Sequence, residues 1–315
     1  MRFLFVLDPL DSLKAYKDTS VAMMRAAQAR GHEVFVSQQE SLHWSGNRVA
    51  AAARRISLTD NDEDWYRPHE TRTLALKELD AVLMRKDPPF DLEYVTSTWL
   101  LSAAVREGAR VFNAPNAIRD HNEKLSIAEF PKFTVPSLAT RDMAALQGFI
   151  EEHRDIVLKP LGGMGGAGIF RVRHDDPNRN VIVETVSELG GRAVMAQRYI
   201  PQIAEGDKRV LLIDGKPVPH CLARIPKPGE SRGNLAAGAR GVAQPLSPRH
   251  REIAQALGPV LAARGLLLVG LDVIGDWLTE VNVTSPTCFR EIQDQTGFDV
   301  AGMFLDALET KLQRH

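Results

Sequence analysis

Five glycines lie within the seven-residue stretch 162–168, Gly-Gly-Met-Gly-Gly-Ala-Gly, which follows a strand-like run ending at Lys159. Glycine allows positive φ and lets backbone N–H groups approach an anion closely, so the stretch predicts a phosphate-binding loop, with a flexible surface hairpin as the alternative. It contains the spacing G-x-G-x-x-G, but in dinucleotide-binding folds that fingerprint opens a helix, whereas residues 169–172 are typical of a strand. No Gly-Lys-Ser/Thr sequence ends the loop, as a Walker A motif requires. We therefore expect a glycine-rich hairpin over phosphates.

Asp272, Glu280 and Asn282 carry oxygen donors on two neighbouring strand-like segments. Glu280 and Asn282 are two residues apart, so on a strand they share a face. Carboxylate and amide oxygens on one face suit Mg²⁺ held together with substrate phosphates, and a solvated strand face is the alternative. A two-residue turn at 275–276 would place Asp272 opposite Thr279. The metal site requires Asp272 opposite Glu280, which a three-residue turn or a bulge would provide.

Two arginines, Arg209 and Arg224, lie on either side of Asp214-Gly215, a dipeptide typical of two-residue hairpin turns. Pairing about this turn predicts Arg209 opposite His220, and Arg224 shares the face of His220 because it lies four residues further on. Two guanidinium groups could close on an anion between them. Two exposed strand arginines are equally compatible with the spacing.

Two other segments have the composition of ligand-contacting loops. The stretch 226–241 holds four glycines, two prolines and three basic residues between strand-like segments, which favours a lid over a domain linker. Its candidate ligand contacts are Arg232, Gly233, Asn234 and Arg240. The run 85–89, Arg-Lys-Asp-Pro-Pro, ends a strand-like segment. Ligands of open α/β sheets bind at the carboxyl ends of strands, so this run is either a ligand-binding segment or a plain turn.

The elements that must position these residues change in pattern near residue 122. Before it, alternating strands and helices predict a β-α-β opening and a parallel sheet, with strands at 2–7, 33–37 and 81–84 and helices at 18–30, 93–107 and 115–130. Residues 41–66 are expected to form a hairpin or irregular structure. Beyond residue 122 the pattern predicts hairpins, at 155–159 with 168–172, 208–213 with 219–225, and 266–273 with 278–283. Helices are expected from Ser247-Pro248 to about 263 and over 299–312.

Composition excludes several classes of protein. The 315 residues carry 39 Lys+Arg against 40 Asp+Glu, so no global basic excess supports nucleic-acid binding. Only two cysteines occur, Cys221 and Cys288, which excludes a disulfide scaffold and a cysteine-based zinc site. The apolar run 3–7 is too short for a signal-peptide core or a membrane span, and no later run approaches about 20 apolar residues. We expect a soluble cytoplasmic protein.

Five blocks, in order along the chain, resemble the signature segments of the prokaryotic glutathione synthetase family of ATP-grasp ligases. They are LMRKDPPFD (83–91), RDHNEKL (119–125), LKPLGGMGGAGIFRV (158–172), GDKRVLLIDGKPVPHCLARIPKPGESRGNLAAGARG (206–241) and VGLDVIGDWLTEVNVTSPTCFREI (269–292). The resemblance implies a mixed α/β and α+β protein with an ATP-grasp fold and an N-terminal Rossmann-like domain. The domains would be 1–122 for substrate, 123–200 with the glycine-rich loop, and 201–315 with the lid and the metal-binding hairpin.

The resemblance implies that γ-glutamylcysteine and ATP form an acyl phosphate, which glycine converts to glutathione with release of ADP and phosphate. It implies Mg²⁺ or Mn²⁺ as the cofactor, small-molecule substrates, no nucleic acid or membrane partner, and a homo-oligomer. The chemistry fits, because a carboxylate is a poor electrophile until it is phosphorylated. Phosphoryl transfer depends mostly on positioning and charge neutralisation, which metals, Lys, Arg and glycine N–H groups provide.

The resemblance also assigns residues to roles. ATP would be contacted by Lys124, Lys159, Gly163, Gly165, Gly166, Gln197, Tyr199 and Asp207, the last on the ribose hydroxyls. The metal would be held by Asp272, Glu280 and Asn282. Arg209 and Arg224 would be catalytic and stabilise the transferring phosphoryl group. The dipeptide and glycine would be contacted by Arg85, Thr284, Ser285 and Thr287.

Three rival functions remain open at this point. An NAD-dependent oxidoreductase requires a helix after residue 168, which the strand-like segment 169–172 argues against. A non-catalytic nucleotide-binding regulator on the same scaffold should have lost its metal ligands. A related ATP-grasp ligase could join another acid to another amine, although the blocks RKDPPFD and NVTSPT favour the glutathione-forming member.

Overall fold

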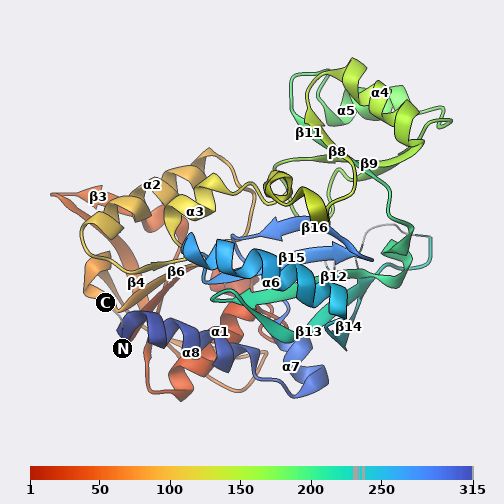
Figure 1. Cartoon of the computed structure of the whole chain (residues 1–315). Coiled ribbons are helices and arrows are strands. Elements are labelled where there is room, and N and C mark those ends of the chain that lie inside the picture. The colour runs from red at the N-terminus through yellow and green to blue at the C-terminus, as the bar shows by residue number, and fades with distance from the viewer. Residues whose placement is uncertain (230–232, 234, 236–237, 314–315) are drawn as a thin grey trace.

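The computed structural model describes residues 1–229, 233, 235 and 238–313, and its three sheets follow one another along the chain (Figure 1). The first sheet has seven strands in the order β3-β4-β2-β1-β6-β7, with β5 paired to β4. Its strands are β1 Arg2–Val6, β2 Glu33–Ser37, β3 His43–Ser45, β4 Arg48–Leu58, β5 Tyr66–Ala75, β6 Ala81–Met84 and β7 Val111–Phe112. Three helices belong to this part of the chain: α1 Thr19–Ala29, α2 Leu92–Arg106 and α3 Pro115–Asp120.

The predicted β-α-β opening and parallel sheet are confirmed, because β1 pairs in parallel with both β2 and β6. The side chain of Asp18 caps α1 by accepting a hydrogen bond from Val21 N at 2.8 Å. The segment 41–66 contains β3 and the long strand β4, which pairs antiparallel with β2 and with β5. The run 85–89 leaves the carboxyl end of β6, as predicted.

The predicted helix over 115–130 is wrong in its second half. α3 ends at Asp120, and the side chain of Asn122 then accepts hydrogen bonds from the backbone N–H groups of Lys124 and Leu125. Such a side-chain turn offers the backbone an alternative to continued helix. The carbonyl of Glu123 accepts a hydrogen bond from Val281 N at 2.8 Å, which ties this turn to the third sheet.

The second sheet has four antiparallel strands in the order β10-β9-β11-β8. They are β8 Ser137–Thr140, β9 Asp155–Pro160, β10 Phe170–Arg173 and β11 Val194–Arg198, with helices α4 Met143–His153 and α5 Arg179–Val186 packed on the sheet. The glycine-rich loop joins β9 to β10, so the predicted hairpin is confirmed. Sequence patterns did not predict β8, α4 or α5.

The third sheet has five antiparallel strands in the order β14-β13-β12-β15-β16. They are β12 Asp207–Ile213, β13 Lys216–Ile225, β14 Arg240–Pro245, β15 Leu268–Ile274 and β16 Trp277–Asn282. Helix α6 Pro248–Ala263 packs against β12, β13 and β15. Ser247 caps α6 as predicted, because its Oγ accepts a hydrogen bond from His250 N at 3.1 Å.

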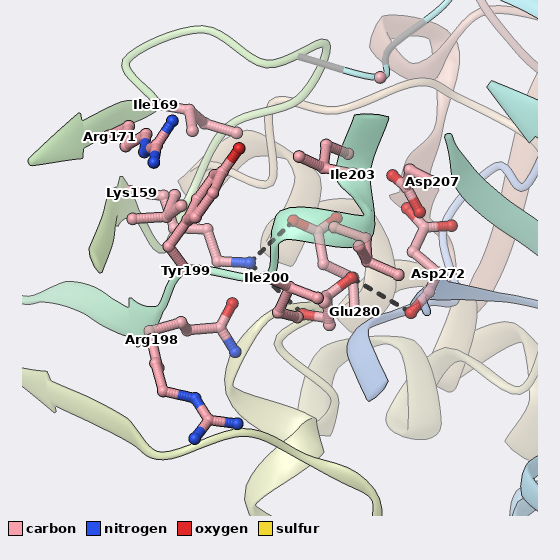
Figure 2. A pocket seen from close by; sticks show the side chains of 15 residues that line it. Lys159, Ile169, Arg171, Arg198, Tyr199, Ile200, Ile203, Asp207, Asp272 and Glu280 are labelled. Carbon is pink, nitrogen blue, oxygen red and sulfur yellow. Dashed lines mark hydrogen bonds and ion pairs between the residues drawn. The ribbon is translucent and has the colours of Figure 1, made fainter. Parts of the chain in front are cut away.

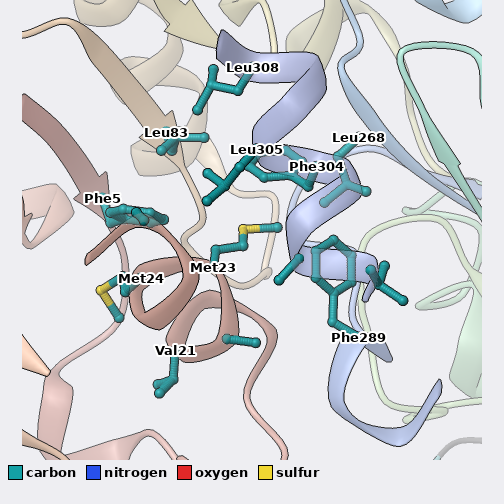
Figure 3. Close-up of a cluster of buried hydrophobic side chains, with 14 of the residues drawn as sticks. Phe5, Val21, Met23, Met24, Leu83, Leu268, Phe289, Phe304, Leu305 and Leu308 are labelled. Atoms are coloured by element: carbon teal, nitrogen blue, oxygen red, sulfur yellow. The ribbon is translucent and has the colours of Figure 1, made fainter. Parts of the chain in front are cut away.

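The last two helices, α7 Phe289–Thr296 and α8 Val300–Gln313, return to the first part of the chain. One apolar core joins Phe5 of β1 and Met23 of α1 to Phe289, Phe304 and Leu305, which are all fully buried or nearly so (Figure 3). Burying each large side chain of this kind stabilises the fold by about 1.5–3 kcal/mol. The C-terminal helices thereby hold the first and third sheets together.

Short 3₁₀ turns connect several of these elements. They are η1 Leu10–Ser12, η2 Gln39–Ser41, η3 Leu76–Glu78, η4 Leu125–Glu129, η5 Pro131–Phe133 and η6 Pro201–Glu205. None of the helices in the described part of the chain combines the length and apolarity needed to cross a bilayer.

Candidate active site

Two adjoining cavities lie where the second and third sheets meet, and Asp272 and Glu280 line both of them. The first cavity is lined by side chains of β9, β10 and β11 on one side and of the third sheet on the other (Figure 2). The second continues from there along the glycine-rich loop to the segment 284–287. A ligand that spans both cavities would pass the two acidic side chains at their junction.

The third sheet brings two arginines onto one carboxylate. Arg209 binds both oxygens of Asp272: Nε donates to Oδ1 at 2.6 Å and Nη2 donates to Oδ2 at 3.2 Å. Arg224 Nη2 lies 2.8 Å from the same Oδ2. Arg224 Nη2 also donates to Asp207 Oδ2 at 2.5 Å. All four side chains are wholly or largely removed from water, so the pairs are held without competing solvent.

The pKa values of Asp272 and Asp207 are shifted in opposite directions. Burial alone would raise the pKa of Asp272, but the guanidinium groups of Arg209 and Arg224 outweigh burial and hold that pKa well below its ordinary value. Burial raises the pKa of Asp207, and the single contact with Arg224 offsets burial only in part. Among the residues that the structure describes, none donates a hydrogen bond to the buried Asp207 Oδ1, so a hydroxyl group of a ligand could do so.

The predicted register of the β12–β13 hairpin is wrong at Arg209. The structure pairs Arg209 with Leu222 rather than His220, because a bulge between Val210 and Leu212 shifts the pairing beyond the turn. The same shift places Arg224 opposite Asp207. A bulge adds a residue to one strand and is not visible in a periodic pattern.

The register that the metal site requires is present. β15 and β16 are joined by a two-residue turn, and an irregularity between Asp272 and Val273 brings Asp272 opposite Glu280. Of the two arrangements that would allow this pairing, the structure therefore has the bulge. Asn282 lies on the same strand as Glu280 and donates its amide N–H to Gly270 O at 3.1 Å, which fixes the orientation of that amide.

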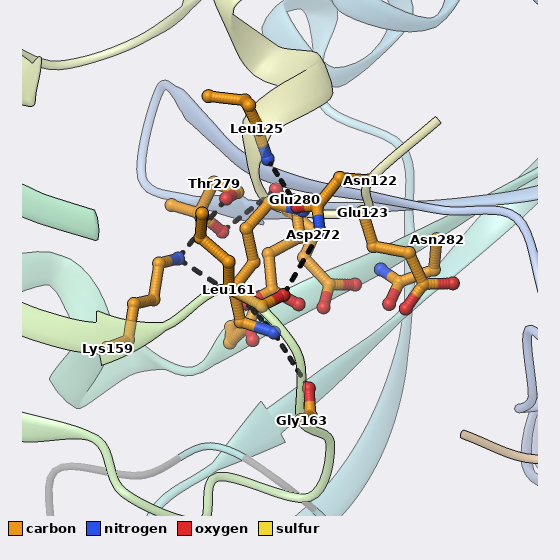
Figure 4. A network of polar contacts seen from close by, with 12 residues as sticks. Asn122, Glu123, Leu125, Lys159, Leu161, Gly163, Asp272, Thr279, Glu280 and Asn282 are labelled. Carbon is orange, nitrogen blue, oxygen red and sulfur yellow. Dashed lines mark hydrogen bonds and ion pairs between the residues drawn. The ribbon is translucent and has the colours of Figure 1, made fainter. Parts of the chain in front are cut away.

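Two lysines approach Glu280: Lys159 from the second sheet (Figure 4) and Lys124 from the turn after α3. Lys159 Nζ lies 3.4 Å from Glu280 Oε1, and Lys124 Nζ lies 3.9 Å from the same oxygen. Lys124 Nζ also donates to the carbonyl of Gly163 at 2.8 Å, which ties the glycine-rich loop to this cluster. Burial lowers the pKa of Lys159, an effect that the nearby Glu280 carboxylate opposes.

The glycine-rich loop provides the backbone that its sequence predicted. Gly165, Gly166 and Gly168 have φ of +69°, +82° and +71°, values that L side chains rarely adopt. Gly163 and Gly165 line the second cavity, so this loop forms one wall of the site.

The donor set at the junction of the cavities fits a hard divalent cation. Asp272, Glu280 and Asn282 all line the second cavity. Within the described residues, Glu280 Oε2 and Asn282 Oδ1 accept no protein hydrogen bond. No group of three or more His, Cys, Asp or Glu in the described ranges is arranged to hold a metal, so a cation here would need further ligands such as phosphate oxygens. That requirement is typical of Mg²⁺, which is commonly held by one or two carboxylates together with substrate phosphates.

The first cavity has apolar walls and a polar end. Isoleucines from several segments line it, together with Gln197 and Tyr199, two residues that the family resemblance predicted to contact ATP. Arg171 stacks on the ring of Tyr199 at 3.7 Å and pairs with Asp155 at 2.6 Å. Arg171 was not singled out from the sequence, because a single strand arginine carries no spacing signal.

The segment 284–287 lines the second cavity through Thr284, Ser285 and Thr287, but Arg85 does not. Arg85 lies behind this segment, where Nε donates to Ser20 Oγ at 3.1 Å and Nη2 donates to Pro286 O at 2.9 Å. It borders a small neighbouring cavity that Thr284 also lines. Arg85 is therefore placed to support the segment from the side of α1.

The predicted lid is only partly described. Arg232 and Asn234 lie outside the described residues. Gly233 lines the first cavity, and a Cβ atom at this position would lie 2.9 Å from both Asp207 Cβ and Arg224 O. Arg240 is the first residue of β14 and lies outside the linings of both cavities.

Comparison with known proteins assigns the chain to a family. The model of the prokaryotic glutathione synthetase N-terminal domain matches residues 1–119, and the model of the prokaryotic glutathione synthetase ATP-grasp domain matches residues 123–297. The chain belongs to the prokaryotic glutathione synthetase family. The ATP-grasp fold predicted from the sequence is thereby confirmed, and the dinucleotide-binding alternative is excluded because β10 follows the glycine-rich loop where that motif needs a helix.

Relatives in this family match the chain over nearly its whole length. A protein from Ralstonia nicotianae named glutathione synthetase is 62% identical over 309 residues, covering 98% of this chain and 95% of that protein. A protein of the same name from Nitrosomonas europaea is 58% identical, covering 100% of this chain and 99% of that protein. Another from Salmonella typhi is 50% identical, covering 98% of each chain. With its ATP-grasp domain, the chain is an ATP-dependent ligase.

Solved structures with low sequence identity share the fold. A D-cycloserine synthetase superposes with a TM-score of 0.70 at 16% identity, covering 98% of this chain and 99% of that one. The ATP-grasp ligase PsnB, solved with a minimal precursor, Mg and ADP, superposes with a TM-score of 0.63 at 20% identity, covering 99% of this chain and 98% of that one. At these identities the likeness concerns the fold alone.

Proposed function

We propose that the chain joins γ-glutamylcysteine to glycine at the expense of ATP, giving glutathione, ADP and phosphate. The observation that carries this proposal is the convergence of two lysines, two arginines and the oxygen donors of β15 and β16 at the junction of two cavities. The near-complete match to relatives named glutathione synthetase supports the choice of substrates. The domain limits predicted from the sequence, 1–122, 123–200 and 201–315, remain part of the proposal.

The first cavity is proposed to hold the nucleoside of ATP. Its isoleucines and Tyr199 would pack on the base, with Gln197 at its polar edge. Asp207 Oδ1, which has no hydrogen-bond partner among the described residues, would accept a hydrogen bond from a ribose hydroxyl. Lys124, Lys159 and the loop glycines Gly163, Gly165 and Gly166 would then face the phosphates, where their N–H groups and charges neutralise the polyphosphate.

The second cavity is proposed to hold the reacting groups. A carboxylate oxygen of the dipeptide attacks the γ-phosphorus, the bond from that phosphorus to the bridging oxygen breaks, and ADP leaves. The amine of glycine then attacks the acyl carbon, phosphate departs with its electron pair, and the amine loses a proton. Arg209 and Arg224 would stabilise the negative charge of both steps, because both guanidinium groups line this cavity.

Asp272, Glu280 and Asn282 would hold Mg²⁺ or Mn²⁺, and a cation there would withdraw charge from the phosphates. Thr284, Ser285 and Thr287 would line the glycine end. Arg85 is proposed to hold the dipeptide by positioning the segment 284–287 from behind. The lid residues Arg232, Gly233, Asn234 and Arg240 would exclude water from the acyl phosphate, which hydrolyses readily.

A cytoplasmic location and a homo-oligomeric state also belong to this proposal. Both cysteines are buried and unpaired with each other, which fits a reducing compartment. The substrates are small polar molecules, so the proposal includes neither a nucleic acid nor a membrane as a partner.

A substrate-omission assay tests the proposed reaction. ADP release, followed by a coupled assay, should require ATP and γ-glutamylcysteine and should rise steeply with glycine, because a trapped acyl phosphate cannot turn over without an amine. Glutathione should appear in a one-to-one ratio with ADP. Equal ADP release with D-alanine in place of both substrates would instead assign the chain to another ATP-grasp ligase.

Asp207→Asn is expected to narrow the preference for ATP over 2′-deoxy-ATP. 2′-Deoxy-ATP lacks the hydroxyl that would donate to the buried Asp207 Oδ1. In the wild-type protein, kcat/KM for 2′-deoxy-ATP should therefore be about 10-fold to 100-fold lower than for ATP. In the variant the ratio of the two kcat/KM values should fall to within about threefold. If Asp207 only orients Arg224, both nucleotides will lose activity equally and the wild-type ratio will persist.

A further inference from the structure

One of the two carboxylate oxygens of Glu123 is fully hydrogen-bonded by protein groups. Glu123 Oε1 accepts hydrogen bonds from Val283 N at 2.9 Å, Thr284 N at 3.0 Å and Thr284 Oγ1 at 2.8 Å. Three donors saturate this oxygen and fix the carboxyl group at the end of β16. Local spacing in the sequence does not mark Glu123, because its partners lie about 160 residues away along the chain.

The other oxygen, Oε2, faces a different environment. Glu123 lines the second cavity beside Asp87, Asn282 and Ser285, and within the described residues Oε2 accepts no protein hydrogen bond. No Lys or Arg of the described part of the chain forms a salt bridge with this carboxylate. Burial raises the pKa of Glu123 despite its hydrogen bonds, and the nearby Glu280 raises the pKa further.

A half-satisfied acidic group in a ligand cavity is unfavourable unless a cation or donor arrives with the ligand. A structural clamp between the turn after α3 and the segment 283–284 would need Oε1 alone. Because Oε1 is fully engaged, Oε2 is the oxygen of this cavity-lining residue that a ligand would have to satisfy. The complement of a carboxylate at this position is a primary ammonium group, which donates strong charge-assisted hydrogen bonds.

We propose that Glu123 Oε2 binds the ammonium group of the glycine acceptor. This inference rests on the proposed function, and it assigns the amine-binding part of the site, which is otherwise lined by Thr284, Ser285 and Thr287. Glu123 would thus be the residue that selects an amino acid, rather than water, as the acceptor of the acyl group.

Both substrates carry an ammonium group, and the position of Glu123 favours that of glycine. The attacking amine must come within about 3–3.5 Å of the acyl carbon, which lies next to the phosphates and hence to Glu280 and Asn282. Glu123 shares the cavity with these two residues. The ammonium group of γ-glutamylcysteine lies at the far end of the dipeptide from its reacting carboxylate, so it would lie away from the acyl carbon.

The test compares two acceptors in wild-type protein and in Glu123→Gln. Hydroxylamine is small and largely uncharged at neutral pH, so it can trap the acyl phosphate as a hydroxamate without an ammonium-binding group. In Glu123→Gln the KM for glycine should rise by about 10-fold to 100-fold, the size of one lost charge-assisted hydrogen bond. The KM values for ATP and γ-glutamylcysteine, and ADP release with hydroxylamine, should stay within about twofold.

Glu291→Gln is the matched control, because Glu291 is also a largely buried glutamate with one unpartnered oxygen but lines neither cavity. It should leave the KM for glycine unchanged. Glu123→Asp, which retains the charge, should restore part of the glycine affinity lost in Glu123→Gln. Thermal unfolding of each variant verifies that it is folded.

Several outcomes would overturn the inference. If Glu123→Gln lowers activity equally with glycine and with hydroxylamine, Glu123 only holds the turn after α3 to the segment 283–284. Failure of both Glu123 variants to fold would lead to the same conclusion. A raised KM for γ-glutamylcysteine with an unchanged KM for glycine would assign the carboxylate to the dipeptide. Absence of glutathione formation by the wild-type protein is a separate result that would refute the proposed function itself.

Discussion

Glu280→Gln is expected to lower kcat/KM for ATP-dependent ligation by at least about 100-fold while the protein stays folded. The substitution keeps the shape of the side chain but removes a negative charge at the junction of the two cavities. The substitution would remove a proposed metal ligand, and the loss of even a residue that only hydrogen-bonds a metal ligand commonly lowers metal affinity or activity 10-fold to 100-fold. Lys124 and Lys159 would also lose their shared counter-charge.

The metal dependence of the variant separates these causes. If Glu280 is a ligand, the Mg²⁺ concentration for half-maximal activity should rise, and part of the activity should return at high Mg²⁺. The control is Glu129→Gln, because Glu129 pairs with Arg264 at 2.6 Å and neither residue lines either cavity, so activity should stay unchanged. Near wild-type activity of Glu280→Gln at low Mg²⁺ would show that the metal assignment is wrong.

Arg224→Lys is expected to lower kcat by about 100-fold to 1,000-fold, the range for loss of one preorganised donor at a developing charge. Arg224 Nη2 lies 2.5 Å from Asp207 and 2.8 Å from Asp272. A lysine side chain is shorter and has a single nitrogen, so it would leave no further guanidinium nitrogen for the transferring phosphoryl group. The charge remains, so the two buried carboxylates stay partly compensated and the fold should survive.

Rapid-quench measurement of ADP formation in a single turnover would show whether the phosphoryl-transfer step itself is slowed. Arg249→Lys is a suitable control, since Arg249 pairs with Glu252 at 2.8 Å on the surface of α6. A fall confined to the KM for ATP, with kcat unchanged, would limit Arg224 to binding and contradict a role in the reaction.

Periodic patterns in the sequence predicted the elements of the fold better than their registers. The alternation of Glu280 and Asn282 placed both on one strand face, and the glycine-rich segment was correctly expected to be a hairpin. The position of Asp272 stayed open and that of Arg209 was predicted wrongly, because each depends on a β-bulge. A bulge is set by packing against neighbouring strands, so it leaves no mark in the local spacing of residue types.

Long-range pairs explain what the sequence could not reveal about the site. Asp207 meets Arg224 across the hairpin of β12 and β13. Arg209 and Arg224 both reach Asp272 on a third strand, β15. Glu123 and Arg85 contact the segment 283–286 from segments far away in the sequence. Such contacts follow from tertiary packing and cannot be derived from local sequence patterns. The resemblance to a family assigned most of these residues to one site but gave no geometry for it.

The place of α8 has a consequence for how a newly made chain reaches its final state. Phe304 and Leu305 complete the apolar core around β1 and α1, yet roughly 270 residues separate them from α1 (Figure 3). During synthesis the N-terminal segments emerge first and would keep this surface exposed to water until α8 follows. Arg85, which rests on Pro286, would likewise wait for its partner. Ribosome-bound chains that stop before α8 should therefore recruit chaperones.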